Sequence, residues 1–170
     1  FMALSANRDE SKSEYFLPSC LDSIKVRFYP EGGTLIPGIS SKIGFTAFNK
    51  WGLPVDVEGE IINQDGESIA HVRTFDKGLG IFTLLNTGNQ KFKFVITGKT
   101  GQNQSFNLPD PDPNGLLLSV LKIDPQFISV NLVFADKQKH SIALTMTLGS
   151  NLSWAADLDI NQGGRIKIPV

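Results

Sequence analysis

The 170-residue sequence contains one cysteine, Cys20, and only two histidines. A single thiol forms no internal disulfide, and it excludes the zinc sites that are built from several cysteines. Charged residues make up 19% of the chain, and sixteen basic side chains nearly balance seventeen acidic ones. Nucleic-acid-binding proteins normally carry a basic excess. The charge balance therefore argues against a nucleic-acid partner.

The sequence also lacks an apolar run of the roughly 18 residues that a membrane-spanning helix needs, so no membrane span is expected in it. Tryptophan and tyrosine are scarce, with two of each, whereas there are twelve Phe, sixteen Gly and nine Pro. Phenylalanine favours strands and packs between sheets, while Gly and Pro supply turns. This composition indicates an all-β protein with many short strands joined by tight turns.

Apolar and polar residues alternate from Ile24 onward. Ile24, Val26 and Phe28 are separated by polar neighbours, as in a strand that buries one face. Turn residues recur between such segments, among them the hairpin signal Asp65-Gly66. About seven or eight strands with turn signals every 8 to 12 residues are typical of a β-sandwich or barrel. The expected strands lie near residues 24–29, 42–47, 55–61, 67–74, 81–85, 92–97 and 104–108.

The clearest boundary in the chain is a segment rich in proline and aspartate. Pro109, Pro111 and Pro113 disrupt both helices and strand ladders. Beyond them we expect five more strands, near residues 116–120, 127–134, 142–148, 152–158 and 165–169, with a further strand or two beyond Val170. We therefore predict four parts: residues 1–22 as a linker or the end of a preceding domain, 23–109 as a first β-sandwich, 110–115 as a hinge, and 116–170 as a second, smaller or truncated β-sandwich.

Two motifs carry a resemblance to a known family. Residues 26–33 read Val-Arg-Phe-Tyr-Pro-Glu-Gly-Gly, and residues 76–82 read Asp-Lys-Gly-Leu-Gly-Ile-Phe. In this order they resemble macroglobulin-type domains, which occur in alpha-2-macroglobulin-like proteins and in large cell-envelope proteins of Bacteroidetes-type bacteria. The resemblance covers residues 24–120. Its motif residues are Pro30, Glu31, Gly32, Gly33, Gly78, Gly80 and Phe82.

The resemblance implies tandem immunoglobulin-like β-sandwiches of the macroglobulin type. It also implies an exported protein at the cell surface or in the periplasm, associated with the outer membrane through the rest of its chain. It does not imply a protease trap, because the trapping members carry a Cys-Gly-Glu-Gln thioester, whereas Cys20 is followed by Leu21.

We interpret the motif residues as structural. Gly32, Gly33, Gly78 and Gly80 are expected to adopt positive φ angles and to allow close backbone approach. Glu31 is expected to accept hydrogen bonds from nearby backbone amides.

No residue is predicted to be catalytic, and no cofactor or metal is predicted. His71 is expected to point outward from a strand, and His140 is expected to follow a charged loop, residues 136–139. Neither accompanies a Gly-x-Ser-x-Gly nucleophile motif. Asp110 and Asp112 have the oxygen ligands that calcium prefers, but their spacing matches no defined calcium loop, so calcium stays open.

The sequence thus favours a non-catalytic structural and interaction module of a larger exported cell-envelope protein. Its expected partners are other domains of the same chain and a protein or a glycan. The alternative is a carbohydrate-binding β-sandwich module appended to a secreted enzyme. Trp51 would be its ligand contact, because this residue lies in a predicted loop, whereas Trp154 is expected in the core. An exposed coplanar aromatic pair would favour this alternative, and a buried Trp51 would exclude it.

Overall fold

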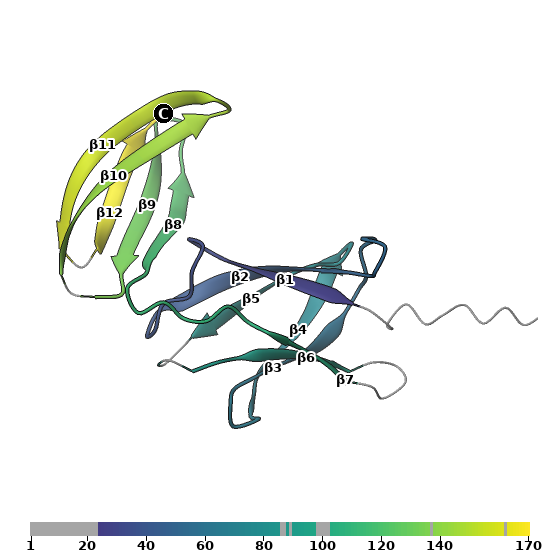
Figure 1. Cartoon of the computed structure of the whole chain (residues 1–170). Coiled ribbons are helices and arrows are strands. Elements are labelled where there is room, and N and C mark those ends of the chain that lie inside the picture. Colours follow the sequence, from purple (N-terminus) through teal and green to yellow (C-terminus); the bar gives the residue numbers. More distant parts are fainter. Residues whose placement is uncertain (1–23, 86–87, 89, 98–102, 137, 162) are drawn as a thin grey trace, which may run out of the picture.

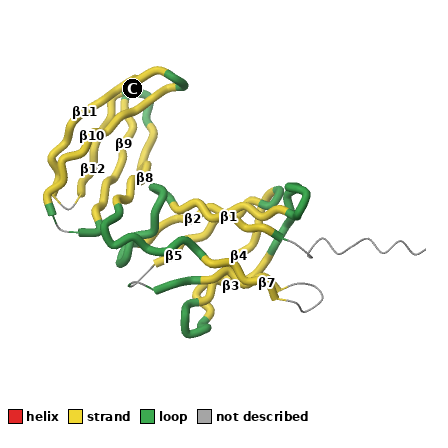
Figure 2. Tube along the Cα trace, viewed as in Figure 1, coloured by secondary structure: helices red, strands yellow, loops and turns green. Residues whose placement is uncertain are grey.

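The computed structural model describes residues 24–85, 88, 90–97, 103–136, 138–161 and 163–170, whose regular structure consists of strands alone (Figures 1 and 2). The all-β prediction is therefore confirmed for these residues. None of them belongs to a helix that could cross a membrane. The predicted linker at residues 1–22, including Cys20, lies outside the described residues. The strands are β1 (Lys25–Pro30), β2 (Ser40–Phe48), β3 (Glu58–Ile62), β4 (Ser68–Asp76), β5 (Leu79–Leu85), β6 (Lys93–Thr97), β7 (Asn103–Asn107), β8 (Leu116–Ile123), β9 (Phe127–Phe134), β10 (Lys139–Leu148), β11 (Asn151–Asn161) and β12 (Gly163–Pro169).

The first seven strands, here called the first lobe, form one antiparallel sheet in the order β1-β2-β5-β4-β3-β6-β7. Strand β4 changes partner along its length. Its residues up to Arg73 pair with β3, whereas Thr74 and Asp76 pair with β5 across a register shift. The sheet therefore folds over at β4, so that β1, β2 and β5 form a layer above β3, β6 and β7 (Figure 1).

The core of the first lobe lies between these two layers. The strands alternate strictly there, so β2 buries Ile43, Phe45 and Ala47 and exposes or half-exposes the residues between them. Phe45 on β2 and Phe94 on β6 meet across the core with ring centroids 5.4 Å apart. The Phe28 ring on β1 lies with its centroid 6.4 Å from that of Phe94. Because phenylalanine buries a large apolar area, this contact holds the two layers together.

The remaining five strands, here called the second lobe, form two small sheets. Strand β9 is central in the order β12-β9-β8, and the hairpin β10-β11 forms the other sheet. The hairpin lies across the three-stranded sheet (Figure 1). Only Val130, Leu144 and Ile168 are buried in the cluster between the two sheets, with half-buried neighbours such as Trp154 packed against them. The expectation that Trp154 belongs to the core is therefore confirmed in part.

Part of the inner face of the second lobe is uncovered. Val120 pairs with Val130, and Ile123 pairs with Ile128, so these two β8 side chains point to the same face as the core residues of β9. They are nevertheless 51% and 75% exposed. The hairpin thus covers the middle of the sheet and leaves the end of β8 open.

The predicted strands are confirmed, with shifted ends. Strand β3 starts at Glu58 instead of residue 55, because the backbone before it bonds elsewhere. Val55 N donates to the carbonyl of Ala47, and Val57 O accepts from Thr74 N. The charged loop predicted before His140 ends earlier than expected, because β10 already starts at Lys139.

Candidate functional site

The segment between β1 and β2 contacts the proline-rich stretch that joins the two lobes. Leu35, which is buried, forms a parallel bridge with Pro111. Its carbonyl accepts a hydrogen bond of 2.8 Å from Asp112 N. The proline-rich stretch predicted as a hinge is therefore bonded to the first lobe. A second hydrogen bond, from Ala135 N to Gly115 O, fixes the end of this stretch to the second lobe.

Gly32 of the Pro-Glu-Gly-Gly motif lies directly against the second lobe. Its φ is +77°, and a Cβ at this position would come within 2.8 Å of Leu118 N and 3.0 Å of the Leu117 side chain. The neighbouring Gly33 has a similar φ of +89° but nothing within 4 Å of such a Cβ. Both glycines therefore serve the turn, whereas Gly32 alone also permits contact between the lobes. We call this set of contacts the joint.

The second motif, residues 76–82, forms the turn between β4 and β5 and packs against β2. At Gly78, which has positive φ as expected, a Cβ would collide with the carbonyl of Ala47. At Gly80 a Cβ would collide with the Phe45 ring, so this glycine makes room for the core. The expectation of positive φ at Gly80 is wrong, because its backbone is ordinary β-strand paired with Phe45. Phe82 is buried, and its ring centroid lies 6.1 Å from that of Phe45.

The turn after β1 is closed by backbone groups alone. Glu31 N donates to Lys42 O, and Gly33 N donates to Pro30 O. The Glu31 carboxylate has no hydrogen bond within the described part of the chain. Its predicted role as an acceptor for local amides is wrong, because the backbone carbonyls already satisfy those amides.

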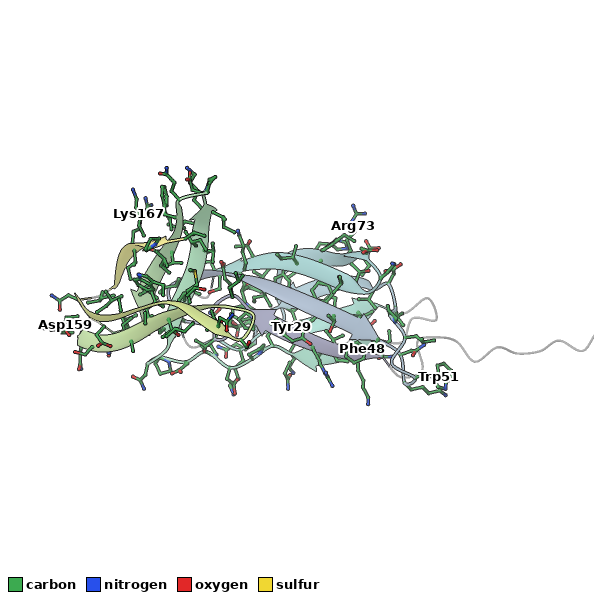
Figure 3. The ribbon with its side chains drawn as sticks, turned by 90° about the horizontal axis from the view of Figure 1, so that it is seen from above. Tyr29, Phe48, Trp51, Arg73, Asp159 and Lys167 are labelled. Carbon is green, nitrogen blue, oxygen red and sulfur yellow. The ribbon has the colours of Figure 1, made fainter. Side chains whose placement is uncertain are left out.

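Trp51 lies at the tip of the loop after β2 and is 62% exposed. The loop is shaped by buried Asn49, whose Oδ1 accepts hydrogen bonds from Trp51 N and Leu53 N, each 3.0 Å long. Lys50 Nζ lies 4.6 Å from the Trp51 ring centroid. In Figure 3 Trp51 projects at the far end of the first lobe, away from the second lobe. No ring pair among the described residues includes Trp51.

The two histidines occupy different surroundings. His71 points outward from β4, as predicted, and its Nε2 lies 3.2 Å from Glu58 Oε1. His140 is half-buried and stacks on Phe134 with a centroid distance of 4.1 Å. Its Nε2 lies 2.6 Å from Asp136 Oδ1. The hydrogen bond from His140 lowers the pKa of Asp136 below its ordinary value of 3.8.

A shallow hollow of about 540 Å³ lies over the β10–β11 hairpin. Two of its polar side chains, Ser141 and Asp159, are bonded to each other. Asp159 accepts hydrogen bonds from Lys139 Nζ at 2.7 Å and from Ser141 Oγ at 2.5 Å. These two donors, the lysine first, lower the pKa of Asp159. Ser141 therefore donates to a carboxylate. The adjacent His140 hydrogen-bonds Asp136 and not Ser141, so the two residues do not form the serine–histidine pair of a nucleophile and its base.

The aspartates of the proline-rich stretch point to different partners. Asp110 forms an ion pair with Lys91 at 3.1 Å. Asp112 Oδ1 accepts a hydrogen bond from Asn114 N. Among the residues that the structure describes, no three His, Cys, Asp or Glu side chains gather as a metal site would require.

One surface was not predicted from the sequence, the outward side of β5. Leu79, Ile81 and Leu85 are all exposed there, although the alternate residues of β5 fill the core. The signal was present in the sequence, because residues 79–85 are nearly continuously apolar. Such a run predicts a strand that is covered on both faces.

Known proteins offer no closer identification. No protein-family model matches this chain, and no curated protein matches it with significance.

Proposed function

We propose that this chain is a non-catalytic structural and interaction module of a larger exported protein, built from two immunoglobulin-like sandwiches in tandem. Strand order supports the immunoglobulin-like assignment of the first lobe. In that fold strands A, B and E form one sheet, and strands C, F and G form the other. Strands β1, β2 and β5, and strands β3, β6 and β7, have these positions, while β4 is shared between the sheets.

The joint is the observation that carries the proposal. A flexible linker would let two domains move independently. Here the backbone bond from Asp112 N to Leu35 O and the contact of Gly32 with Leu117 and Leu118 fix their mutual position. A fixed angle between consecutive sandwiches suits a spacer that holds binding surfaces at a set distance. The proposal that this chain belongs to an exported cell-envelope protein rests on the motif resemblance.

Substituting the two motif glycines tests the joint. Asparagine tolerates positive φ better than other side chains, so Gly32→Asn and Gly33→Asn carry similar backbone strain. Only Gly32→Asn places a side chain between the lobes. Small-angle X-ray scattering should show a wider distribution of lobe positions for Gly32→Asn, while Gly33→Asn should match the parent chain. Equal scattering from all three proteins would refute a joint that depends on this contact.

Localisation is tested in the source cells with an antibody raised against this chain. Fractionation followed by protease treatment of intact cells should give a membrane-associated band that the protease removes. A soluble cytoplasmic band that resists external protease would overturn the exported assignment.

A carbohydrate-binding module is the second candidate, and exposed Trp51 favours it. Apolar sugar faces stack on aromatic rings, but Lys50 Nζ already lies over this one. Titration with neutral oligosaccharides, monitored by tryptophan fluorescence, tests this candidate. A saturable change that Trp51→Ala abolishes and Trp154→Phe preserves would support it, whereas no change in the parent chain would eliminate it.

A further inference from the structure

The outward face of β1, β2 and β5 is unusual for a surface exposed to water. Strand pairing aligns its side chains in rows across the three strands. Tyr29, Gly44 and Ile81 form one row, and Arg27, Thr46 and Leu79 form the next. Figure 3 looks down on this layer, with Tyr29 near the second lobe and Phe48 toward the far end. We call these rows, with their neighbours Lys42, Phe48 and Leu85, the upper face.

The upper face is strongly apolar. Tyr29, Leu79, Ile81 and Leu85 are between 43% and 57% exposed. Strands with one solvated face normally place polar residues outward, and contiguous exposed apolar side chains mark interaction sites. The opposite layer follows the ordinary rule, because its outward residues include Glu58, His71 and Lys93.

The charges on the upper face are mainly positive. Its outward ionisable side chains on the three strands are Lys25, Arg27 and Lys42, apart from the exposed phenol of Tyr29. One carboxylate, that of Asp76 on β4, borders the face where Asp76 pairs with Leu79. None of the three cations forms an ion pair with a described residue. Arg27 instead lies over the Phe48 ring, 5.3 Å from its centroid. An apolar area with an excess of cations at its rim complements a partner that has carboxylates around an apolar group.

Gly44 supplies an independent observation. It lies in the middle of β2 with regular pairing on both sides, and its φ is not positive. A Cβ there would meet only Tyr29 O, at an ordinary 3.8 Å. The fold therefore does not require glycine, although glycine weakens a strand. Its effect is to leave this row without a side chain between Tyr29 and Ile81, so a side chain from outside can lie over Gly44.

The charges also select the class of partner. Two copies docked face to face would each bring three cations against one carboxylate, which is unfavourable. An anionic membrane matches the charge, but a fluid lipid surface has no fixed side chain to lie over Gly44 between Tyr29 and Ile81. A polypeptide matches the charge, the apolar rows and the gap over Gly44 together.

We propose that the upper face docks another polypeptide, which places an apolar side chain over Gly44 and carboxylates beside Arg27 and Lys42. This inference rests on the proposed function, because it names the chemistry of the partner that the interaction module binds. Its test uses purified chain in solution, so it can fail without affecting the joint or the localisation, and either of those can fail without affecting it.

The test is a display library of random peptides of about twelve residues, long enough to cross three strands spaced about 4.8 Å apart, panned against residues 1–170. Enriched peptides should carry an aliphatic or aromatic residue flanked by Asp or Glu. Fluorescence anisotropy with the best peptide should show binding weakened about tenfold or more by Gly44→Leu, as for a central contact. Binding should also weaken as salt rises, since the charges are exposed.

Matched variants distinguish specific binding at the upper face from nonspecific binding to apolar surface. Ser105→Leu adds the same side chain to the outward side of β7 on the opposite layer, and it should leave binding unchanged. If Gly44→Leu unfolds the chain, Ile81→Thr removes an apolar contact without added bulk and should weaken binding. Absence of enrichment, enriched peptides without acidic residues, or equal binding by Gly44→Leu would overturn the proposal. Gly44-dependent sedimentation with phosphatidylglycerol vesicles would overturn it in favour of a lipid surface.

Discussion

The two lobes bury their apolar residues to very different extents. Fourteen of the described residues form the buried cluster of the first lobe, whereas three form that of the second. The difference does not come from strand length, because β10 and β11 are the longest strands of the chain. It comes from how completely the layers of each lobe cover one another. The first sheet folds back on itself at β4, so each layer covers the other.

The second lobe shows what an incomplete cover leaves behind. Its hairpin is two strands wide and its main sheet is three strands wide, so Leu118 of β8 still packs against the core, whereas the end of β8 with Val120 and Ile123 stays uncovered. Hydrophobic stabilisation scales with the area removed from water, so Val120 and Ile123 contribute little. The comparison teaches that alternation alone does not make a core, because each inward row also needs an opposing layer.

The largest effects should come from the two cores. Phe94→Ala removes a ring that contacts Phe28 and Phe45, and it should destabilise the first lobe by about 3–5 kcal/mol. Leu144→Ala in the thinner core should cost about 2 kcal/mol, the lower end of the range for such truncations. Urea unfolding of the full chain measures both. A larger cost for Leu144→Ala would contradict the contrast between the lobes.

Two turns in which a side chain accepts backbone hydrogen bonds should differ less in their contribution to the free energy of unfolding. Buried Asn63 accepts hydrogen bonds from Asp65 N and Glu67 N. Asn63→Ala leaves these amides without their acceptor and should cost about 1–3 kcal/mol.

Asp124 in the turn after β8 is the matched position. Its Oδ1 accepts an exposed hydrogen bond from Gln126 N, and its Oδ2 forms an exposed ion pair with Lys122, which contributes little at a surface. Asp124→Ala should therefore change the free energy of unfolding by no more than about 0.5 kcal/mol. Equal costs for the two alanine variants in thermal unfolding would show that burial does not distinguish the turns.

The sequence predicted the strands well because alternation is a local signal. Asp65-Gly66 marked the hairpin turn between β3 and β4, where Gly66 has a φ of +83°. Only one of the two roles of Gly32, its place in the turn, was predicted from the sequence. A turn needs positive φ locally, whereas the approach of Leu117 depends on residues about eighty-five positions away, which spacing does not reveal. The stacking of His140 on Phe134 was not predicted for a related reason, because it depends on the β9–β10 connection.

The interaction surface was the least predictable feature. Leu79, Ile81 and Leu85 become one face only when β5 pairs with β2, and β2 lies thirty residues earlier in the chain. Arg27 and Lys42 are ordinary surface residues in the sequence. Their common sign matters only because β1 and β2 bring them to the same side.

A polar substitution in the uncovered part of β8 sharpens the comparison further. Ile123→Ser should change the free energy of unfolding by no more than about 0.5 kcal/mol, because the side chain is already mostly in water. The control is Ile61→Ser in β3, where the side chain is fully buried. That variant should cost several times more, since it adds a buried hydroxyl to a lost apolar contact. A large loss from Ile123→Ser would mean that β8 is covered in solution.

The smallest effect concerns pH and the second lobe alone. The pKa of Asp136 is lowered from 3.8, first by the hydrogen bond from His140. A lowered folded-state pKa stabilises the protein above the unfolded value, and this stabilisation is lost as pH falls through the folded value. Asp136→Asn should therefore be slightly less stable than the parent near neutral pH, and the difference should disappear in acid below pH 3.8. Urea unfolding at stepped pH measures it. His140→Phe, which keeps an aromatic ring against Phe134 but removes the bond to Asp136, should lose the same pH-dependent part; retention of that part would assign it to another carboxylate.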